Sequence, residues 1–147
     1  MDSNTFIPTA FIEKMSTILP DNLNIEDLIS ACRRPLRRAI RVNTVKISID
    51  DFLVIAENKN WTLTSVPWCK EGFWIETDND TTPIGNTAEH LAGLFYVQEA
   101  SSMMPVSALF HHFNNNSDVT LLDAAAAPGS KTTQLAAQLN NQGLIIA

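Results

Sequence analysis

The sequence is poor in cysteine and has no long apolar run. Cys32 and Cys69 are its two cysteines in 147 residues, too few for a disulfide framework or a four-thiolate zinc site. Residues 1–5 lack the basic start and apolar run of a signal peptide. No apolar stretch approaches the roughly 20 residues that span a bilayer. We therefore expect a cytoplasmic protein that binds neither a membrane nor a metal.

Basic residues are also scarce, and most of them lie in one stretch. The chain has 10 Lys and Arg against 16 Asp and Glu, a formal net charge of −6. The stretch from residue 33 to residue 46 contains no acid and holds Arg33, Arg34, Arg37, Arg38, Arg41 and Lys46. A solvated face is one interpretation, but arginines bunched on a strand and its lead-in favour contact with a polyanion.

The overall composition suits a packed protein. Hydrophobic residues make up 45% and charged residues 18%, which permits a core, and the length suits one domain or two small ones. Apolar spacing predicts helices over residues 11–19, 24–32, 49–58, 87–91 and 101–112. It predicts strands over residues 37–45, 61–66, 73–76 and 94–98, a turn at 67–72, a linker at 77–82 and a loop at 114–117.

Two groups of side chains give further expectations. The strand at 37–45 places Ile40 and Val42 on one face and Arg41 and Asn43 on the other, which predicts a half-buried strand that displays polar groups. Aromatic residues at 61, 68, 73 and 74 are suited to stacking on bases, although packing in a small core is the favoured interpretation.

The last third of the chain contains its clearest pattern. Residues 119–123 form a predicted buried strand, 124–130 a turn of small residues, 131–139 a helix and 144–147 a second strand, which together make a βαβ unit. Such turns bind ligands in α/β folds. The turn is no P-loop, because Ser130 separates Gly129 from Lys131, and its single glycine excludes a dinucleotide fingerprint. A tight turn with no ligand is the competing interpretation.

Three ordered segments resemble one protein family. Residues 122–136, LDAAAAPGSKTTQLA, resemble the S-adenosylmethionine-binding motif of the Fmu/Sun (Nop2-type) RNA cytosine-5 methyltransferases. Residues 35–46, PLRRAIRVNTVK, and 95–105, FYVQEASSMMP, are similar to that family's RxxIRVNTLK and YxQExSSMxP segments. Residues 66–75, VPWCKEGFWI, resemble the bacterial subgroup that methylates 16S ribosomal RNA.

The resemblance implies an α/β fold in two parts. Residues 1–82 would form a small α+β subdomain that contacts RNA. Residues 83–147 would begin a doubly wound, Rossmann-like, S-adenosylmethionine-dependent methyltransferase domain that is truncated after its second strand. The RNA-contacting residues implied are Arg37, Arg38, Arg41 and Lys46. The S-adenosyl-L-methionine-contacting residues implied are Ala125, Ala126, Ala127, Pro128, Gly129, Ser130 and Lys131.

The resemblance also implies that catalytic residues are missing. The family's catalytic and releasing cysteines follow the cofactor loop at a distance, so we expect the nucleophile beyond Ala147 and an inactive N-terminal fragment. Cys32 falls on the inward stripe of a helix and is predicted to be a buried, inert thiol. Cys69 falls in a turn, where it is expected to be exposed and where the charge of Lys70 would modestly lower its pKa. We assign neither a catalytic role.

The expected partner is ribosomal RNA in the small ribosomal subunit. The full-length enzyme is expected to be monomeric. The alternative is a stand-alone RNA-binding module whose cofactor loop is vestigial.

Overall fold

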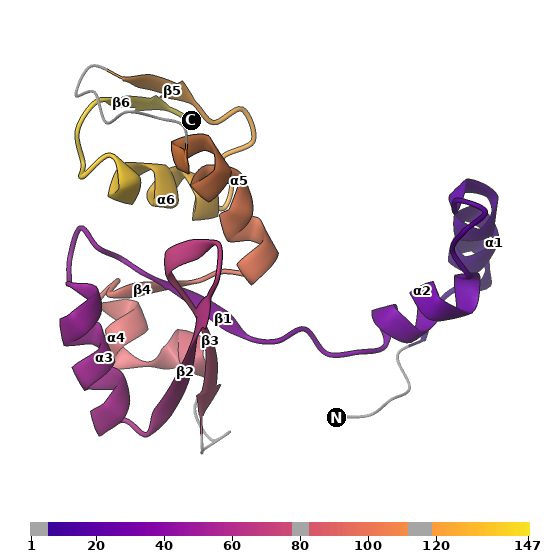
Figure 1. The fold of residues 1–147 in the computed structure, drawn as a ribbon, viewed down its shortest axis with the longest axis horizontal. Helices are drawn as coiled ribbons and strands as arrows, with labels where there is room; N and C mark the ends of the chain where they lie inside the picture. Colours follow the sequence, from indigo (N-terminus) through magenta and orange to yellow (C-terminus); the bar gives the residue numbers. More distant parts are fainter. Residues whose placement is uncertain (1–5, 78–82, 112–118) are drawn as a thin grey trace. The chain divides into compact units, whose positions relative to one another are not determined.

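The computed structural model describes residues 6–77, 83–111 and 119–147 (Figure 1). The chain divides into two compact units, Met1–Leu36 and Arg37–Ala147. The predicted loop at 114–117 lies outside the described residues, as does the predicted linker apart from Thr77. None of the helices in the described ranges is long and apolar enough to cross a membrane.

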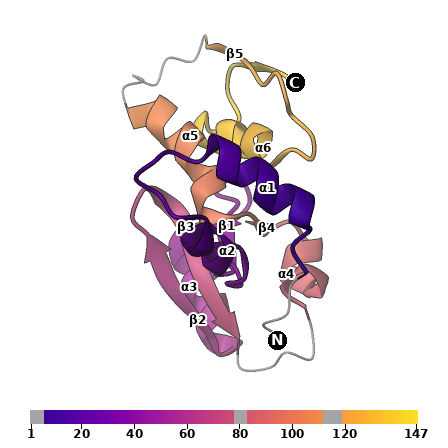
Figure 2. The ribbon, with the colours of Figure 1, turned by 90° about the vertical axis from the view of Figure 1, so that its right-hand side faces the viewer.

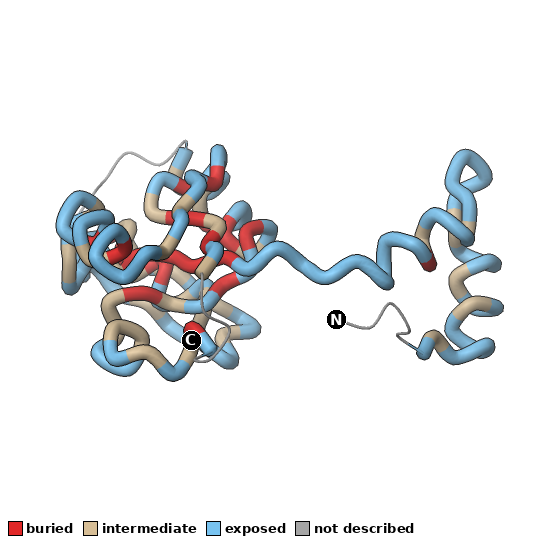
Figure 3. Tube along the Cα trace, turned by 90° about the horizontal axis from the view of Figure 1, so that it is seen from below, coloured by how far each residue is buried: buried red, intermediate tan, exposed pale blue. Residues whose placement is uncertain are grey.

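The first unit consists of two helices, α1 (Thr9–Ile18) and α2 (Ile25–Cys32). The Asn24 side chain caps α2 by accepting a hydrogen bond from the Glu26 backbone N–H at 2.9 Å, and the helix lies within the predicted range of residues 24–32. Ile29 is buried, whereas most of α1 and α2 is exposed or half-buried (Figure 3).

The second unit is built on a four-stranded antiparallel sheet. Its strands are β1 (Ala39–Val42), β2 (Trp61–Val66), β3 (Cys69–Thr77) and β4 (Phe95–Val97), in the order β2-β3-β1-β4. The predicted turn at 67–72 is too long, because only Pro67 and Trp68 form the turn and β3 already begins at Cys69. A register shift at Ser65 and Val66 lets the chain reverse within Pro67 and Trp68. Strand β4 lies after residue 82, where the first of the two predicted parts ends, and it pairs with β1 of that first part.

Helix α3 (Ile49–Asn58) covers one face of this sheet. Ser48 caps it by accepting a hydrogen bond from the Asp51 N–H. Phe52 of α3 packs with Ile40 and Val42 of β1 and with Ile84 from the 3₁₀ helix η1 (Ile84–Asn86). The short helix α4 (Ala88–Leu91) follows η1 and leads into β4.

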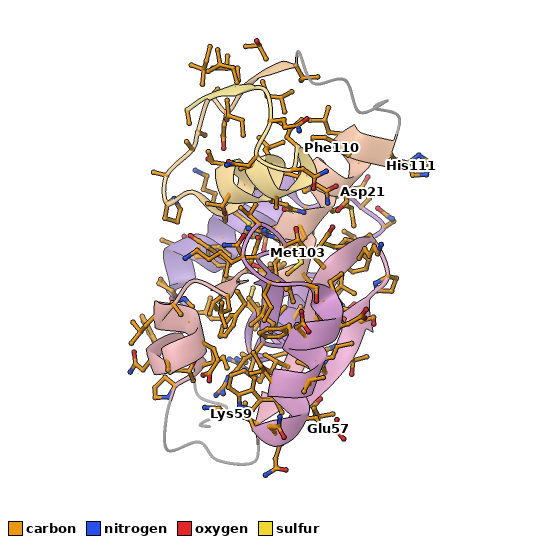
Figure 4. All side chains as sticks on the ribbon, turned by 90° about the vertical axis from the view of Figure 1, so that its left-hand side faces the viewer. Asp21, Glu57, Lys59, Met103, Phe110 and His111 are labelled. Atoms are coloured by element: carbon orange, nitrogen blue, oxygen red, sulfur yellow. The ribbon has the colours of Figure 1, made fainter. Side chains whose placement is uncertain are left out.

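Helix α5 (Ala100–His111) packs against the opposite face. Met103 is fully buried with Ala39 and Cys69, and it lies among densely packed side chains in Figure 4. A Cβ on Gly72 would lie 2.6 Å from the Met103 sulfur, so any larger residue here would force the Met103 side chain to shift, and glycine lets α5 lie close to β3. Because both faces of β1 are covered, all four of its residues are buried, and the predicted half-buried strand is wrong.

The βαβ unit is confirmed. Strands β5 (Thr120–Leu122) and β6 (Leu144–Ile146) pair in parallel, with α6 (Ser130–Gln138) between them in sequence. Helix α6 lies between this pair and the four-stranded sheet (Figures 1 and 2). The prediction of a buried strand at 119–123 is wrong, because Leu122 is 72% exposed. The described part of the chain is therefore a mixed α/β fold with an antiparallel sheet and a small parallel pair.

Candidate cofactor loop and nucleic-acid interface

The turn between β5 and α6 is held by one carboxylate. Asp123 accepts a hydrogen bond from the Ala125 N–H at 3.3 Å and another from the Thr132 hydroxyl at 2.7 Å. Its own N–H donates to the Ile146 carbonyl at 2.8 Å. Asp123 therefore ties the start of the turn to α6 and to β6, which orients the small residues between them.

Gly129 marks the end of the turn and the N-terminal end of α6. Its φ is +103°, a left-handed conformation that side chains other than glycine rarely adopt. No described atom lies within 4 Å of the position that a Cβ would take, and no side chain caps the helix. The first N–H groups of α6 are thus available to an anionic group, at the positive end of the helix dipole.

Two hydrogen bonds join the turn to earlier parts of the chain. The Tyr96 hydroxyl of β4 donates to the Pro128 carbonyl at 3.3 Å, and the Lys131 ammonium donates to the Ser102 hydroxyl of α5 at 3.3 Å. Tyr96 and Ser102 belong to the FYVQEASSMMP segment. The structure therefore brings two of the three segments singled out in the sequence into contact.

Arg41 brings in the third segment. It is 2% exposed, so the expected exposed placement of its side chain on a polar strand face is wrong. Its Nε donates to Gln98 Oε1 at 2.9 Å and its Nη2 to Thr133 Oγ1 at 2.8 Å. Burial lowers the pKa of the Arg41 guanidinium, against the opposing effects of Cys69, Glu71 and Tyr96, and the group stays protonated at neutral pH.

Two buried glutamines extend this network. The Gln98 amide donates to Gln134 Oε1 at 3.1 Å, and the Gln134 amide donates to the Met103 carbonyl at 3.1 Å. Gln98, Thr133 and Gln134 lie inside motifs quoted from the sequence, yet they were not predicted as site residues. Gln98 and Gln134 are buried, whereas Thr133 is exposed, and the available signal was the presence of uncharged polar residues among small and apolar ones in these motifs.

The other predicted RNA-contacting residues are exposed. The Arg37 guanidinium lies 4.6 Å from the centre of the Trp74 ring and forms a long ion pair of 3.6 Å with Glu76. Arg38 is exposed beside it, and both line a shallow pocket with Ile75 and Glu76. The Lys46 ammonium donates to the Ala92 carbonyl at 2.7 Å.

The aromatic residues divide between the core and the surface. Trp61 packs against Phe52 and Phe95, and Phe73 is buried in the same cluster, as the favoured interpretation predicted. Trp68 is 37% exposed and meets Trp74 edge to face, with ring centres 5.9 Å apart. Trp74 of this pair contacts Arg37, and the pair is the remaining candidate for stacking on a base.

Both predictions for the cysteine environments are wrong. Cys32 is exposed, and Cys69 is buried at 2% exposure because it begins β3 beneath α5. Burial raises the pKa of the Cys69 thiol, and the nearby Glu71 carboxylate raises it further. Among residues 6–77, 83–111 and 119–147, no group of three or more His, Cys, Asp and Glu side chains could hold a metal.

Comparison with known proteins gives one consistent result. A family described as the N-terminal domain of 16S rRNA methyltransferase RsmF matches residues 7–100. Ribosomal RNA small subunit methyltransferase F of Vibrio parahaemolyticus is 63% identical over 147 residues, which cover 100% of this chain and 30% of the relative. The protein of that name from Escherichia coli is 57% identical over 143 residues, 97% of this chain and 29% of the relative.

Solved structures show the same likeness. A methyltransferase homologue from Pyrococcus horikoshii aligns with a TM-score of 0.70 and 34% identity, over 95% of this chain and 47% of that one. NSun6 from the same organism, solved with SFG, aligns with a TM-score of 0.70 at 18% identity, over 94% of this chain and 57% of that one, and supports the fold alone. The chain spans about 30% of the length of the curated relatives it matches.

Proposed function

Because the chain belongs to the family of the N-terminal domain of 16S rRNA methyltransferase RsmF, we propose that it is the N-terminal part of an enzyme forming 5-methylcytosine in 16S ribosomal RNA. The methyl donor would be S-adenosyl-L-methionine, and the enzyme would work in the cytoplasm as a monomer. The observation that carries the proposal is the contact of all three segments around the start of α6. Arg41, Tyr96 and Gly129 each come from a different segment and meet there.

The turn before α6 suits the proposed cofactor. S-adenosyl-L-methionine carries a carboxylate, which the open N–H groups at the start of α6 can bind. Ala125, Ala126, Ala127 and Pro128 let a ligand approach the backbone, and the space beside Gly129 is free of described atoms. When bound, the cofactor supplies an electrophilic methyl group. Ser130 and Lys131 lie at the first turn of α6 and complete the proposed contacts.

The exposed basic residues suit RNA. Arg37 and Arg38 lie before β1, and Lys46 lies between β1 and α3; all three are exposed, which suits contact with phosphates. Arg41 belongs to the proposed RNA interface as well, from a buried position in the wall of a pocket beside α6. In this proposal residues 1–82 form the RNA-contacting subdomain and 83–147 begin a doubly wound methyltransferase domain, with β4 completing the sheet of the first part.

The test is methyl transfer by the protein of the complete reading frame. We expect it to transfer a radiolabelled methyl group to cytosine in 16S ribosomal RNA, whereas residues 1–147 alone transfer none. Transfer by the short chain that is lost in Cys69→Ser would contradict the assignment of the nucleophile to a later residue. RNA binding by a complete protein that neither binds S-adenosyl-L-methionine nor transfers methyl groups would instead support a stand-alone RNA-binding module.

A further inference from the structure

A small pocket lies beside the start of α6, between β1, β4 and α4. It has a volume of about 270 Å³, enough for one phosphate group, since a water molecule takes about 30 Å³ of liquid. The residues that supply polar groups to its wall are Arg41, Asn43, His90, Gly93, Tyr96 and Thr133. None of the described residues lining it is an Asp or a Glu, although the whole chain carries a net charge of −6.

The pocket holds a buried positive charge that has no close negative partner. Arg41 is 2% exposed, and its two hydrogen-bond partners, Gln98 and Thr133, are neutral. No ion pair found among the described residues involves Arg41, and Glu71 acts on it only at longer range. A buried charge is costly unless an opposite charge compensates it. A bound anion would supply that compensation.

Two further groups suit an anion at this place. Within the described residues, the buried Nδ1 atom of His90 has no hydrogen-bond partner, and His90 lines the same pocket. Lys46 lies at the rim, because a Cβ on Gly93 would be 2.8 Å from its ammonium nitrogen. The guanidinium, the imidazole and the ammonium thus come from β1, α4 and the connection after β1.

We propose that this pocket binds a phosphodiester group of the RNA, with Arg41 and His90 in its wall and Lys46 at its rim. The inference rests on the proposed function, which supplies RNA as the polyanion. A phosphodiester fits because it presents several acceptor oxygens on one charge, and arginine recognises such groups through its planar donors. Thr133 begins the second turn of α6, so the bound phosphate would lie next to the proposed cofactor loop and would set where the RNA enters.

The experiment compares two probes that differ only in phosphate. The 147-residue chain, labelled with ¹⁵N, is titrated with cytidine and with cytidine 3′,5′-bisphosphate. The Arg41 Nε–H is hydrogen-bonded to Gln98 and reports directly on the pocket. We expect the bisphosphate to shift the Arg41 Nε and His90 imidazole signals and cytidine to shift neither. Lys46→Gln and His90→Gln should each weaken bisphosphate binding at least threefold, whereas Lys14→Gln, an exposed lysine of α1, should not.

Three results would overturn the proposal. The first is that the bisphosphate shifts the NMR signals of Arg37 and Arg38 but leaves the Arg41 signal unchanged. The second is S-adenosyl-L-methionine shifting Arg41 and His90 and displacing the bisphosphate, which would assign the pocket to the cofactor. The third is unchanged bisphosphate affinity in both Lys46→Gln and His90→Gln.

A 12-nucleotide RNA separates this inference from the proposed function. Salt-dependent binding of that RNA by the wild-type chain, together with any of the three results above, would remove the pocket assignment and leave the proposed RNA interface intact. Shifts of Arg41 with the bisphosphate, together with no binding of the RNA, would support the anion pocket and contradict the RNA function.

Discussion

Arg41 Nη2 donates a hydrogen bond of 2.8 Å to Thr133 Oγ1, across a separation of 92 residues in the sequence. This contact joins the central strand of the antiparallel sheet to the helix that follows the proposed cofactor loop. Thr133 also donates to the Gly129 carbonyl at 2.8 Å. The basic segment and the glycine at the N-terminal end of α6 are therefore linked through a single hydroxyl group.

Arg41→Met should lower the free energy of unfolding of the second unit by about 1–3 kcal/mol, because Gln98 loses its buried partner. Chemical denaturation followed by tryptophan fluorescence measures the change, and Trp61 is a suitable reporter in the core. Arg34→Met, at an exposed position of the first unit, is the matched control and should leave this transition unchanged. An equal loss in both variants would show that Arg41 has no special structural role.

Gly129→Val in the protein of the complete reading frame should weaken S-adenosyl-L-methionine binding tenfold or more. Valine is strained at φ +103°; such strain costs about 1–3 kcal/mol, and the part of that range above about 1.4 kcal/mol corresponds to tenfold or more in affinity. Calorimetry measures the affinity. Gly85→Val is the control, since Gly85 has open space and no positive φ. Wild-type affinity in a folded Gly129→Val protein would remove the loop from the cofactor site.

The two cysteines should differ in reactivity. Cys32 is exposed and Cys69 is buried, so a thiol reagent at pH 8 should label Cys32 rapidly and Cys69 only after unfolding. Because burial and Glu71 raise the pKa of Cys69 above its ordinary value, its thiolate forms at a higher pH than that of a free cysteine. Glu71→Gln should lower that pKa. Rapid labelling of Cys69 in the native chain, counted by mass spectrometry in Cys32→Ser, would contradict this environment.

The ion pair between Lys59 and Glu89, 2.9 Å long, should make the free energy of unfolding depend on pH. Burial raises the pKa of Glu89, but the hydrogen bond from Lys59, a backbone N–H and the charge of Lys59 outweigh it, and the net pKa lies below the ordinary value. The stabilisation is therefore present above the unfolded-state pKa and is lost as the pH falls through the folded-state pKa. NMR titration should show a higher Glu89 pKa in Lys59→Met and no change in Lys14→Met. An unchanged Glu89 pKa in Lys59→Met would contradict the pairing.

Local patterns were sufficient for most of the secondary structure. Asn24 and Ser48 mark the starts of helices α2 and α3, because each caps its helix through a hydrogen bond to a backbone N–H within three residues. The βαβ unit at 119–147 is visible in the sequence because a run of small residues between a strand and a helix is a local signature. The turn before β3 was misjudged, because the bulge that shortens it depends on the pairing with β2.

The sequence by itself determined which segments are candidates for the chemistry, namely one acid-free basic stretch and one alanine-rich loop ending in Gly129, and it left neither cysteine with an assigned catalytic role. Tertiary structure alone decided what surrounds them. Alternation on a strand tells which residues share a face, but burial depends on what packs on that face. Helices α5 and α6 cover the side of β1 that carries Arg41, so a residue expected at the surface is buried in the wall of a pocket, 2% exposed. Cys69 is buried under α5 for the same reason, whereas Cys32, which was expected to be buried, is exposed on α2.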